Sequence, residues 1–372
     1  MVPLTSIDHI GILQLSKIEG IGVNKLRTLV SNFSSPKEVF LAELSDLTSI
    51  DGINTTIAKR IKKESDENNF VSFAEHQIAF ADKYKSRIIS YWDEDYPYLL
   101  RKIYDPPVIL FVTGKMQKFD ENALAVVGTR TPTNYGKKFT EKFVAELVGY
   151  NIAIISGLAR GIDTISHSSA LKSGGETIAV LGSGLDVIYP PENKKLFQEI
   201  TENGCVISEY VFGTKPDAVN FPKRNRIISG MSLGTVVIET DVNGGAMQTA
   251  RYALDQNREV FTLPGNIEVK QSRGANQLIQ RGHAKLITSV EDIISEFGNK
   301  FKIYSKEEKK VDTSQLNIFE SKLFELINSE PIHIDLLAEK AESQTSECLV
   351  HLLTLEFKDL IKQLPGKYFV RE

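Results

Sequence analysis

The sequence has few of the residues that mark a secreted, membrane-spanning or metal-binding protein. Its two cysteines, Cys205 and Cys348, lie far apart in the chain, which argues against a disulfide framework. No apolar run approaches the length of about 20 residues that a helix needs to cross a bilayer. Residues 1–5 carry no basic flank before an apolar stretch, as a signal peptide would. The six histidines are scattered without zinc-ligand spacing. We therefore expect a cytoplasmic protein without a membrane partner, a cofactor or a metal site.

The sequence also lacks an overall basic charge, since 44 Lys and Arg are set against 48 Asp and Glu. Nucleic-acid binding would therefore need a local cluster of cations. One lies in residues 221–228, where Lys223, Arg224 and Arg226 follow a Phe-Pro step. Pro222 biases Phe221 away from the helical region, so we predict an extended approach and a helix over residues 224–231.

Cations at a helix start oppose the helix macrodipole unless an anion lies nearby. Two interpretations of this cluster stay open from its own residues. The anion is either a phosphate or a set of acids in the same chain, such as Glu209, Glu239 or Asp241.

A regular alternation of strand-like and helix-like segments fills the middle of the chain. The strand-like runs are short, β-branched and nearly continuous, as in strands buried on both faces. They cover residues 124–127, 152–155, 177–181, 205–207, 236–238 and 260–263, and amphipathic segments at 135–148, 162–172, 194–201 and 246–256 separate them. This order predicts an α/β fold with a doubly wound, mostly parallel sheet.

Further modules flank this domain. Residues 18–23 and 50–55 form an approximate repeat, Ile-Glu-Gly-Ile-Gly-Val and Ile-Asp-Gly-Ile-Asn-Thr, which is typical of paired helix-hairpin-helix units that hold phosphates or simply pack. The aromatic-rich residues 85–118, with Trp92, predict a small β extension packed against the next domain. Near the C-terminus, three helical patterns and a hairpin predict a winged-helix module for DNA or protein contact.

These patterns divide the chain into four predicted parts. They are a helical domain with the helix-hairpin-helix, or SAM-like, repeat (residues 1–70), the doubly wound α/β domain (71–298), a charged linker (299–315) and a winged-helix domain (316–372).

Ligands of open α/β sheets bind beyond the carboxyl ends of the strands, and there this sequence places glycines, hydroxyls and arginines. Main-chain N–H groups at helix starts and arginines together suit phosphate. Each residue also has a structural interpretation: the glycines permit tight turns, and Asp163 caps its helix. The predicted nucleic-acid-binding residues are Gly128, Thr129, Arg130, Ser156, Gly157, Arg160, Gly161, Phe221, Lys223, Arg224, Asn225, Arg226 and Gly245.

Motifs of several enzyme classes are missing. The glycines after the first and third strands do not complete the G-x-G-x-x-G fingerprint, and no G-x-x-x-x-G-K-[ST] loop occurs. Neither Ser156 nor Ser183 has a recognisable base partner. An alternative function remains: a Rossmann nucleotide-binding or phosphoribohydrolase-like enzyme acting on nucleoside monophosphates through Glu239 or Asp241.

In this order the motifs resemble those of the DNA-processing protein A family, DprA or Smf, of bacterial natural transformation. The matching stretches are residues 128–130, 156–163, 182–190, 221–230, 258–265 and 274–279, while residues 243–250 depart from the usual Ser-Gly-Ser-Leu before Thr-Ala. The resemblance implies a protein without catalytic activity that binds single-stranded DNA, protects it and loads a RecA-type recombinase onto it. For the α/β domain it implies an extended Rossmann-like fold and a homodimer formed through this Rossmann domain. It also implies phosphate contacts from Arg130 and residues 224–226, and a stacking or core role for Phe221.

Overall fold

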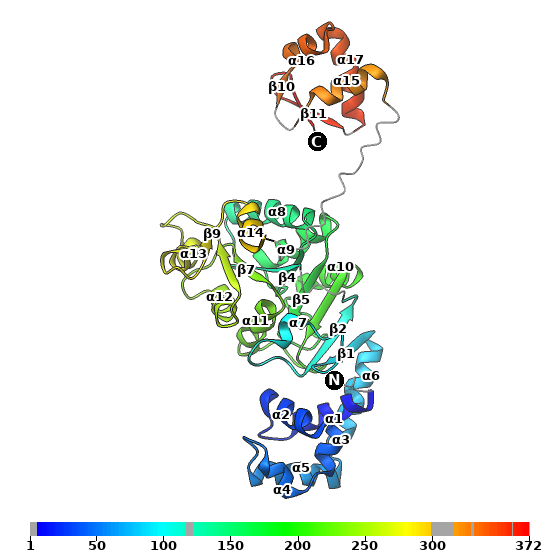
Figure 1. The fold of residues 1–372 in the computed structure, drawn as a ribbon, viewed down its shortest axis with the longest axis vertical. Helices are drawn as coiled ribbons and strands as arrows, with labels where there is room; N and C mark the ends of the chain where they lie inside the picture. The colour runs from blue at the N-terminus through cyan, green and yellow to red at the C-terminus, as the bar shows by residue number, and fades with distance from the viewer. Residues whose placement is uncertain (1–5, 117–121, 299–315, 329–330, 359, 372) are drawn as a thin grey trace. The chain divides into compact units, whose positions relative to one another are not determined.

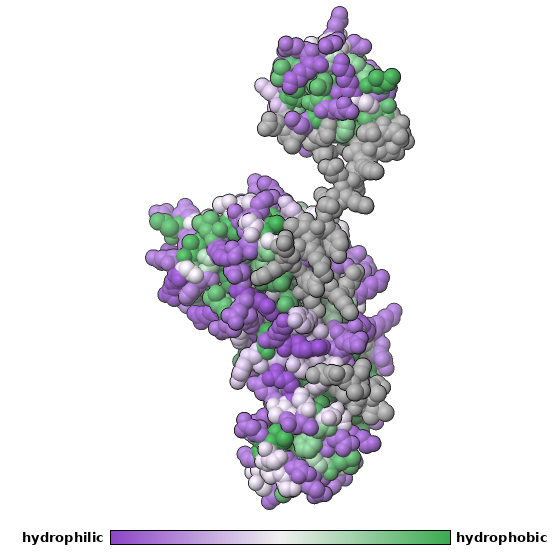
Figure 2. All heavy atoms as spheres, in the orientation of Figure 1, coloured by the Kyte–Doolittle hydropathy of each residue, from purple (hydrophilic) through white to green (hydrophobic). Residues whose placement is uncertain are grey.

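The computed structural model describes residues 6–116, 122–298, 316–328, 331–358 and 360–371 (Figure 1). The chain divides into two compact units, Met1–Tyr304 and Ser305–Glu372. The linker predicted for residues 299–315 lies outside the described residues. Within the described ranges, no helix has the length and apolar character needed to cross a membrane. Hydrophilic residues cover much of both units on the face shown in Figure 2, with hydrophobic residues between them.

The predicted repeat forms two helix-hairpin-helix units near the N-terminus. The helices of this region are α1 (Ser6–Lys17), α2 (Val23–Phe33), α3 (Pro36–Leu41), α4 (Leu44–Ser49), α5 (Thr55–Glu67) and α6 (Val71–Lys83). Gly20 and Gly52 take positive φ angles of 93° and 79° in the two hairpins, a conformation that glycine adopts without strain. Asn54, where the second copy lacks a glycine, caps α5 by accepting a hydrogen bond from the Ile57 N–H.

The apolar runs form one sheet in the order β1-β2-β6-β5-β4-β3-β7-β8-β9. The strands are β1 (Ser86–Ser90), β2 (Ile109–Gly114), β3 (Ala123–Val127), β4 (Ala153–Ser156), β5 (Thr177–Leu181), β6 (Gly204–Ser208), β7 (Gly234–Val237), β8 (Glu259–Thr262) and β9 (Lys285–Leu286). All neighbours from β6 to β9 pair in parallel. From β3 the chain winds outwards through β4, β5 and β6 and then returns to β7 on the other side of β3. The strand order therefore reverses at β3, where open α/β sheets bind ligands.

Helices cover both faces of the sheet, as the buried runs predict (Figure 1). Ala125 and Val127 of β3 pack with α11 (Asn220–Gly230) and α12 (Gly245–Asp255) on one face. Leu124 and Val126 pack on the other face with α8 (Asn134–Gly149), α9 (Ile162–Lys172) and α14 (Glu291–Phe297). The remaining elements of this unit are α7 (Tyr98–Arg101), the 3-10 helix η1 (Pro191–Asn193), α10 (Lys194–Glu202) and α13 (Lys270–Gln280).

The aromatic-rich segment does not form a separate β extension. Its strands β1 and β2 join the main sheet, where β2 pairs antiparallel with both β1 and β6. A hydrophobic cluster continues from this edge into the N-terminal helices, since Ile12 and Leu13 belong to the same cluster as Phe111 and Phe212. The helix-hairpin-helix region and the sheet thus share a core.

The second unit is a winged-helix module, as predicted. It consists of α15 (Ile318–Leu326), α16 (Ile334–Ala341), α17 (Thr345–Phe357) and the strands β10 (Ile332–His333), β11 (Ile361–Leu364) and β12 (Tyr368–Arg371). These strands lie in the order β10-β12-β11 and pair antiparallel. Asn317 and Glu320 start α15 with a reciprocal capping box.

Candidate functional site

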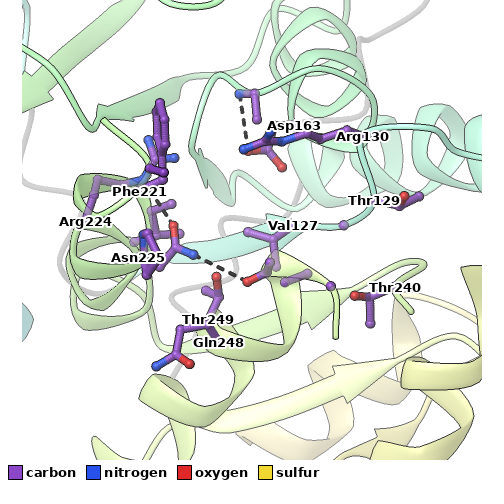
Figure 3. Close-up of a pocket in the computed structure, with 18 of the residues that line it drawn as sticks. Val127, Thr129, Arg130, Asp163, Phe221, Arg224, Asn225, Thr240, Gln248 and Thr249 are labelled. Carbon is purple, nitrogen blue, oxygen red and sulfur yellow. Dashed lines mark hydrogen bonds between the residues drawn. The ribbon is translucent and has the colours of Figure 1, made fainter. Parts of the chain in front are cut away.

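A cavity of about 700 Å³ opens at the carboxyl ends of the parallel strands, beside the point where the strand order reverses. Its wall includes Val127 at the end of β3, Gly128 to Arg130 after it, Thr240 and Asp241 after β7, and the first turns of α11 and α12. Figure 3 shows Phe221, Arg224 and Asn225 on one side of the view, with Thr129, Arg130 and Asp163 on the other. Of the predicted residues, those that line the cavity are Gly128, Thr129, Arg130, Phe221, Arg224, Asn225 and Gly245.

The extended approach predicted for Phe221 is wrong, because α11 begins at Asn220 and includes Phe221. A proline is tolerated in a first helical turn, where its missing N–H would have no partner within the helix. The ring of Phe221 is half-buried in the cavity wall, 5.8 Å from the Arg130 guanidinium carbon and 6.0 Å from that of Arg224. Its other neighbour is the ring of Tyr189, at 5.5 Å between centroids. The ring is thus partly open to the cavity and flanked by cations.

Arg224 is 4% exposed, and its guanidinium hydrogen-bonds to the protein. Nη1 donates to the Gly157 carbonyl at 2.9 Å and to the Val180 carbonyl, and Nε donates to the Asn225 side chain. A Cβ atom at Gly157 would lie 2.7 Å from Arg224 Nη2, so a glycine is needed where the arginine passes. Arg224 therefore ties the loop after β4 to the end of β5. The phosphate contact predicted for it stays a prediction.

Asp163 lies beside Arg224 on the cavity wall and is also buried. Its Oδ2 accepts the Gly157 N–H at 3.1 Å and the Ala159 N–H at 3.4 Å, so it stabilises the turn that leads into α9. Burial raises the pKa of Asp163 to about 6, although the Arg224 charge opposes this shift. Burial also lowers the pKa of Arg224 to about 10, which leaves it charged at neutral pH. The two residues form a buried pair of opposite charge.

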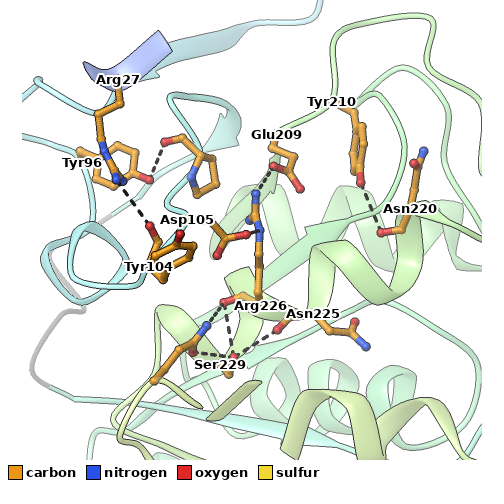
Figure 4. A network of polar contacts seen from close by, with 12 residues as sticks. Arg27, Tyr96, Tyr104, Asp105, Glu209, Tyr210, Asn220, Asn225, Arg226 and Ser229 are labelled. Atoms are coloured by element: carbon orange, nitrogen blue, oxygen red, sulfur yellow. Dashed lines mark hydrogen bonds and ion pairs between the residues drawn. The ribbon is translucent and has the colours of Figure 1, made fainter. Parts of the chain in front are cut away.

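Arg226 forms ion pairs with acids of the same chain, which is one of the two interpretations of the cation cluster. Its Nε lies 2.9 Å from Asp105 Oδ2, and its Nη2 lies 2.6 Å from Glu209 Oε2 (Figure 4). The arginine is 6% exposed and does not line the cavity. It joins α11 to the segment before β2 and to the end of β6. Lys223, one turn earlier on the same helix, is exposed.

The other predicted residues support the rim from behind or from the side. The Ser156 hydroxyl is buried and donates to the Val126 carbonyl, which links β4 to β3. Gly161 has a φ of 77°, and a Cβ atom there would clash with the Thr129 carbonyl oxygen. Arg160 is half-exposed, forms a bidentate pair with Glu192 and does not line the cavity.

The acids of the alternative enzymatic interpretation differ in their surroundings. Glu239 is 2% exposed, and its carboxylate accepts hydrogen bonds from the Thr133 N–H and hydroxyl at 2.9 and 2.5 Å, where α8 begins. It therefore anchors a helix start. Asp241 lines the cavity and lies 3.6 Å from Lys270 Nζ. Among the described residues, no cluster of His, Cys, Asp or Glu could hold a metal ion.

The residue-by-residue prediction missed several parts of the cavity wall, among them Tyr189, Gln248 and Thr249. Tyr189 had a visible signal, since it belongs to the Gly182 to Pro190 motif. Gln248 and Thr249 had a weaker one, because they lie near the start of α12, three and four residues after Gly245 of the rim.

Comparisons with known proteins agree with this architecture. Residues 87–298 match the family model described as DNA recombination-mediator protein A, residues 12–67 match a SAM-like helix-hairpin-helix tandem, and residues 307–367 match the DprA winged helix domain. Protein Smf of Synechocystis is 38% identical over 291 residues, which cover 77% of this chain and 72% of that protein.

Two solved structures are also similar. DNA processing protein A from Streptococcus pneumoniae aligns with a TM-score of 0.67 and 35% identity, over 79% of this chain and 99% of the other. DNA processing protein A from Helicobacter pylori, described for its unique mode of binding single-stranded DNA, aligns with a TM-score of 0.53 and 31% identity, over 59% and 98% of the two chains. The family model covers more than half of this chain, and the domains before and after it match as well. The chain belongs to the DprA/Smf family of DNA-processing proteins.

Proposed function

We propose that this protein binds single-stranded DNA in the cavity at the carboxyl edge of its sheet. The observation that carries the proposal is the half-buried Phe221 ring in the cavity wall, with the exposed Arg130 guanidinium 5.8 Å away. An aromatic ring accepts any base by stacking, and an adjacent cation attracts the phosphate, so the pair suits a strand without regard to sequence. The main-chain N–H groups at the start of α12 add a second anion-binding element.

Membership of the family extends the proposal to a cellular role. The protein would act in the cytoplasm as a recombination mediator that protects incoming DNA during natural transformation and loads a RecA-type recombinase onto it. It would work as a homodimer formed through the Rossmann domain and would catalyse no reaction. The similarity to the Helicobacter protein, whose described ligand is single-stranded DNA, supports the DNA-binding part.

The test is a titration of labelled oligo-dT and of duplex DNA, followed by fluorescence anisotropy at several salt concentrations. We expect oligo-dT to bind more tightly than duplex DNA. Its affinity should fall steeply with salt: a plot of the logarithm of the binding constant against the logarithm of the salt concentration should have a slope of about −0.7 for each phosphate neutralised. Arg130→Ala should weaken binding about 10-fold or more, since a hydrogen bond to a charged group contributes about 1.5–3 kcal/mol. Lys142→Ala, which removes an exposed cation of α8 that pairs with Glu146, is the matched control.

Equal affinity of wild type and Arg130→Ala at every salt concentration would exclude the proposed phosphate contact. Recombinase loading is measured separately, as filament formation on strands coated with a single-strand-binding protein, and the dimer by mass in solution. The enzymatic alternative predicts the release of free base from a nucleoside monophosphate. Release of free base, abolished by Asp241→Asn, would favour that alternative over the mediator.

A further inference from the structure

The segment from Tyr98 to Asp105 exposes two aromatic rings next to cations. Tyr98 is 54% exposed and Tyr104 is 86% exposed. Lys102 Nζ lies 3.9 Å from the centroid of the Tyr98 ring, which places a positive charge on the face of that ring. Tyrosine usually buries much of its ring, so two exposed rings within seven residues indicate a contact surface. We call Tyr98, Lys102, Tyr104 and Arg27 the tyrosine surface.

This surface is fixed to the helix that forms the cavity wall. Asp105, next to Tyr104, accepts from Arg226 Nε at 2.9 Å, and Arg226 lies one turn after Pro222 at the cavity wall (Figure 4). The four residues from Pro222 to Arg226 span only about 6 Å of helix axis. Stacked DNA rises about 3.4 Å along its axis for each nucleotide of a strand, so about two nucleotides span this part of α11. A strand that leaves the cavity past Pro222 would run along the helix to which Asp105, the neighbour of Tyr104, is bonded.

The charges along this route favour a polyanion. Lys223 is exposed and lies three residues before Arg226, on the same side of α11. The acids Asp105 and Glu209 are both paired with Arg226. Arg27 of the N-terminal region reaches over to donate to the Tyr104 carbonyl at 3.5 Å. In the described parts of the chain, no carboxylate lies within ion-pair distance of Arg27, Lys102 or Lys223.

We propose that the tyrosine surface is a second contact for single-stranded DNA, which reaches it from the cavity along Lys223. The rings would stack on bases, and the cations would neutralise phosphates of the same strand. Paired bases of a duplex are not free to stack on these rings, so the contact is specific for a single strand. The proposal rests on the proposed function, because the same strand occupies the cavity.

The experiment compares a short oligo-dT of about 6 nucleotides, within the size that one binding site covers, with one of about 20 nucleotides. The full chain carries Tyr98→Ala together with Tyr104→Ala. We expect unchanged affinity for the short strand and a loss of at least about fivefold for the long one, the lower end for one stacked base. Tyr104→Phe keeps the ring and should bind the long strand like the wild type.

Tyr150→Ala is the matched control, since Tyr150 follows α8 at the opposite, amino edge of the sheet. A second measurement is direct: photocrosslinking of a strand with 5-iodouracil should label the peptide that contains Tyr104. Wild-type affinity of the double variant for the long strand, with no crosslink in this peptide, would overturn the proposal and leave the surface to a protein partner. Failure of the wild type to bind either strand would instead refute the proposed function.

Discussion

Replacement of Arg224 by methionine should destabilise the fold before it affects any ligand. Methionine keeps much of the apolar volume but removes the donors to the Gly157 and Val180 carbonyls. It also leaves the buried Asp163 carboxylate without its neutralising charge. Loss of one partner of a buried ionic pair typically costs about 3–5 kcal/mol. We therefore expect a loss of this size in the free energy of unfolding at pH 7.

Urea unfolding, followed by circular dichroism, measures this loss. The double variant Arg224→Met with Asp163→Asn should recover part of it, because no buried charge then remains without an opposite charge. Both residues bond to the main chain of Gly157, and coupling between residues of one hydrogen-bond network is about 0.5–3 kcal/mol. Arg130→Ala is the surface control, and its stability should stay within about 0.5 kcal/mol of the wild type. The reasoning is refuted if Arg224→Met unfolds at the wild-type urea concentration yet loses its affinity for single-stranded DNA. Arg224 would then act on the ligand and not on the fold.

Three further outcomes follow from the geometry of the rim and the first module. The pKa of Asp163 is raised to about 6 in the folded state from 3.8, so the folded protein binds a proton more readily than the unfolded chain. The stability that this residue contributes therefore falls as pH rises through this window. From pH 4 to pH 7, the unfolding free energy of the wild type should decrease relative to that of Asp163→Asn. Urea unfolding should show a larger loss of unfolding free energy for Gly161→Ala than for Gly174→Ala. Both glycines have a positive φ, but of the two only Gly161 faces a carbonyl, that of Thr129. Equal losses would show that the close approach of Gly161 to this carbonyl does not matter. Asn54→Ala removes the α5 cap and should lower the unfolding free energy by about 0.5–2 kcal/mol, whereas an unchanged urea midpoint would contradict the capping role.

Much of the fold could be predicted from local pattern. Residues 177–181 and 162–172 form a strand and a helix with the predicted bounds. For the strand, burial on both faces requires a nearly continuous apolar run. The rule that ligands bind at carboxyl strand ends also placed Gly128 to Arg130 at one cavity. These inferences need only neighbours in sequence and the general rules of α/β topology.

The partners of the buried cations could be predicted only in part. Glu209, one of the acids expected near the cluster, does pair with Arg226. Arg226 is neutralised by Asp105, which lies far earlier in the chain and reaches α11 only because β1 and β2 join the main sheet. Arg224 Nη1 donates to a main-chain carbonyl, a group that every residue carries, so the sequence does not reveal this partner. The start of α11 was misjudged because the tendency of Phe221 to avoid helix before proline is weak against the packing of that helix on the sheet.

The cluster that joins Ile12 and Leu13 to Phe111 and Phe212 has a practical consequence for dissecting the protein. A truncation at residue 70 would uncover side chains that each contribute about 1.5–3 kcal/mol when buried, against a typical net stability of about 5–15 kcal/mol. If such a truncated chain lost its activity, the cause would be misfolding and aggregation, and the experiment would not reveal the function of the missing helices. Point substitutions in the hairpins are the sound way to probe that task. A cut at the boundary between the two compact units, near residue 305, leaves the core of each unit intact.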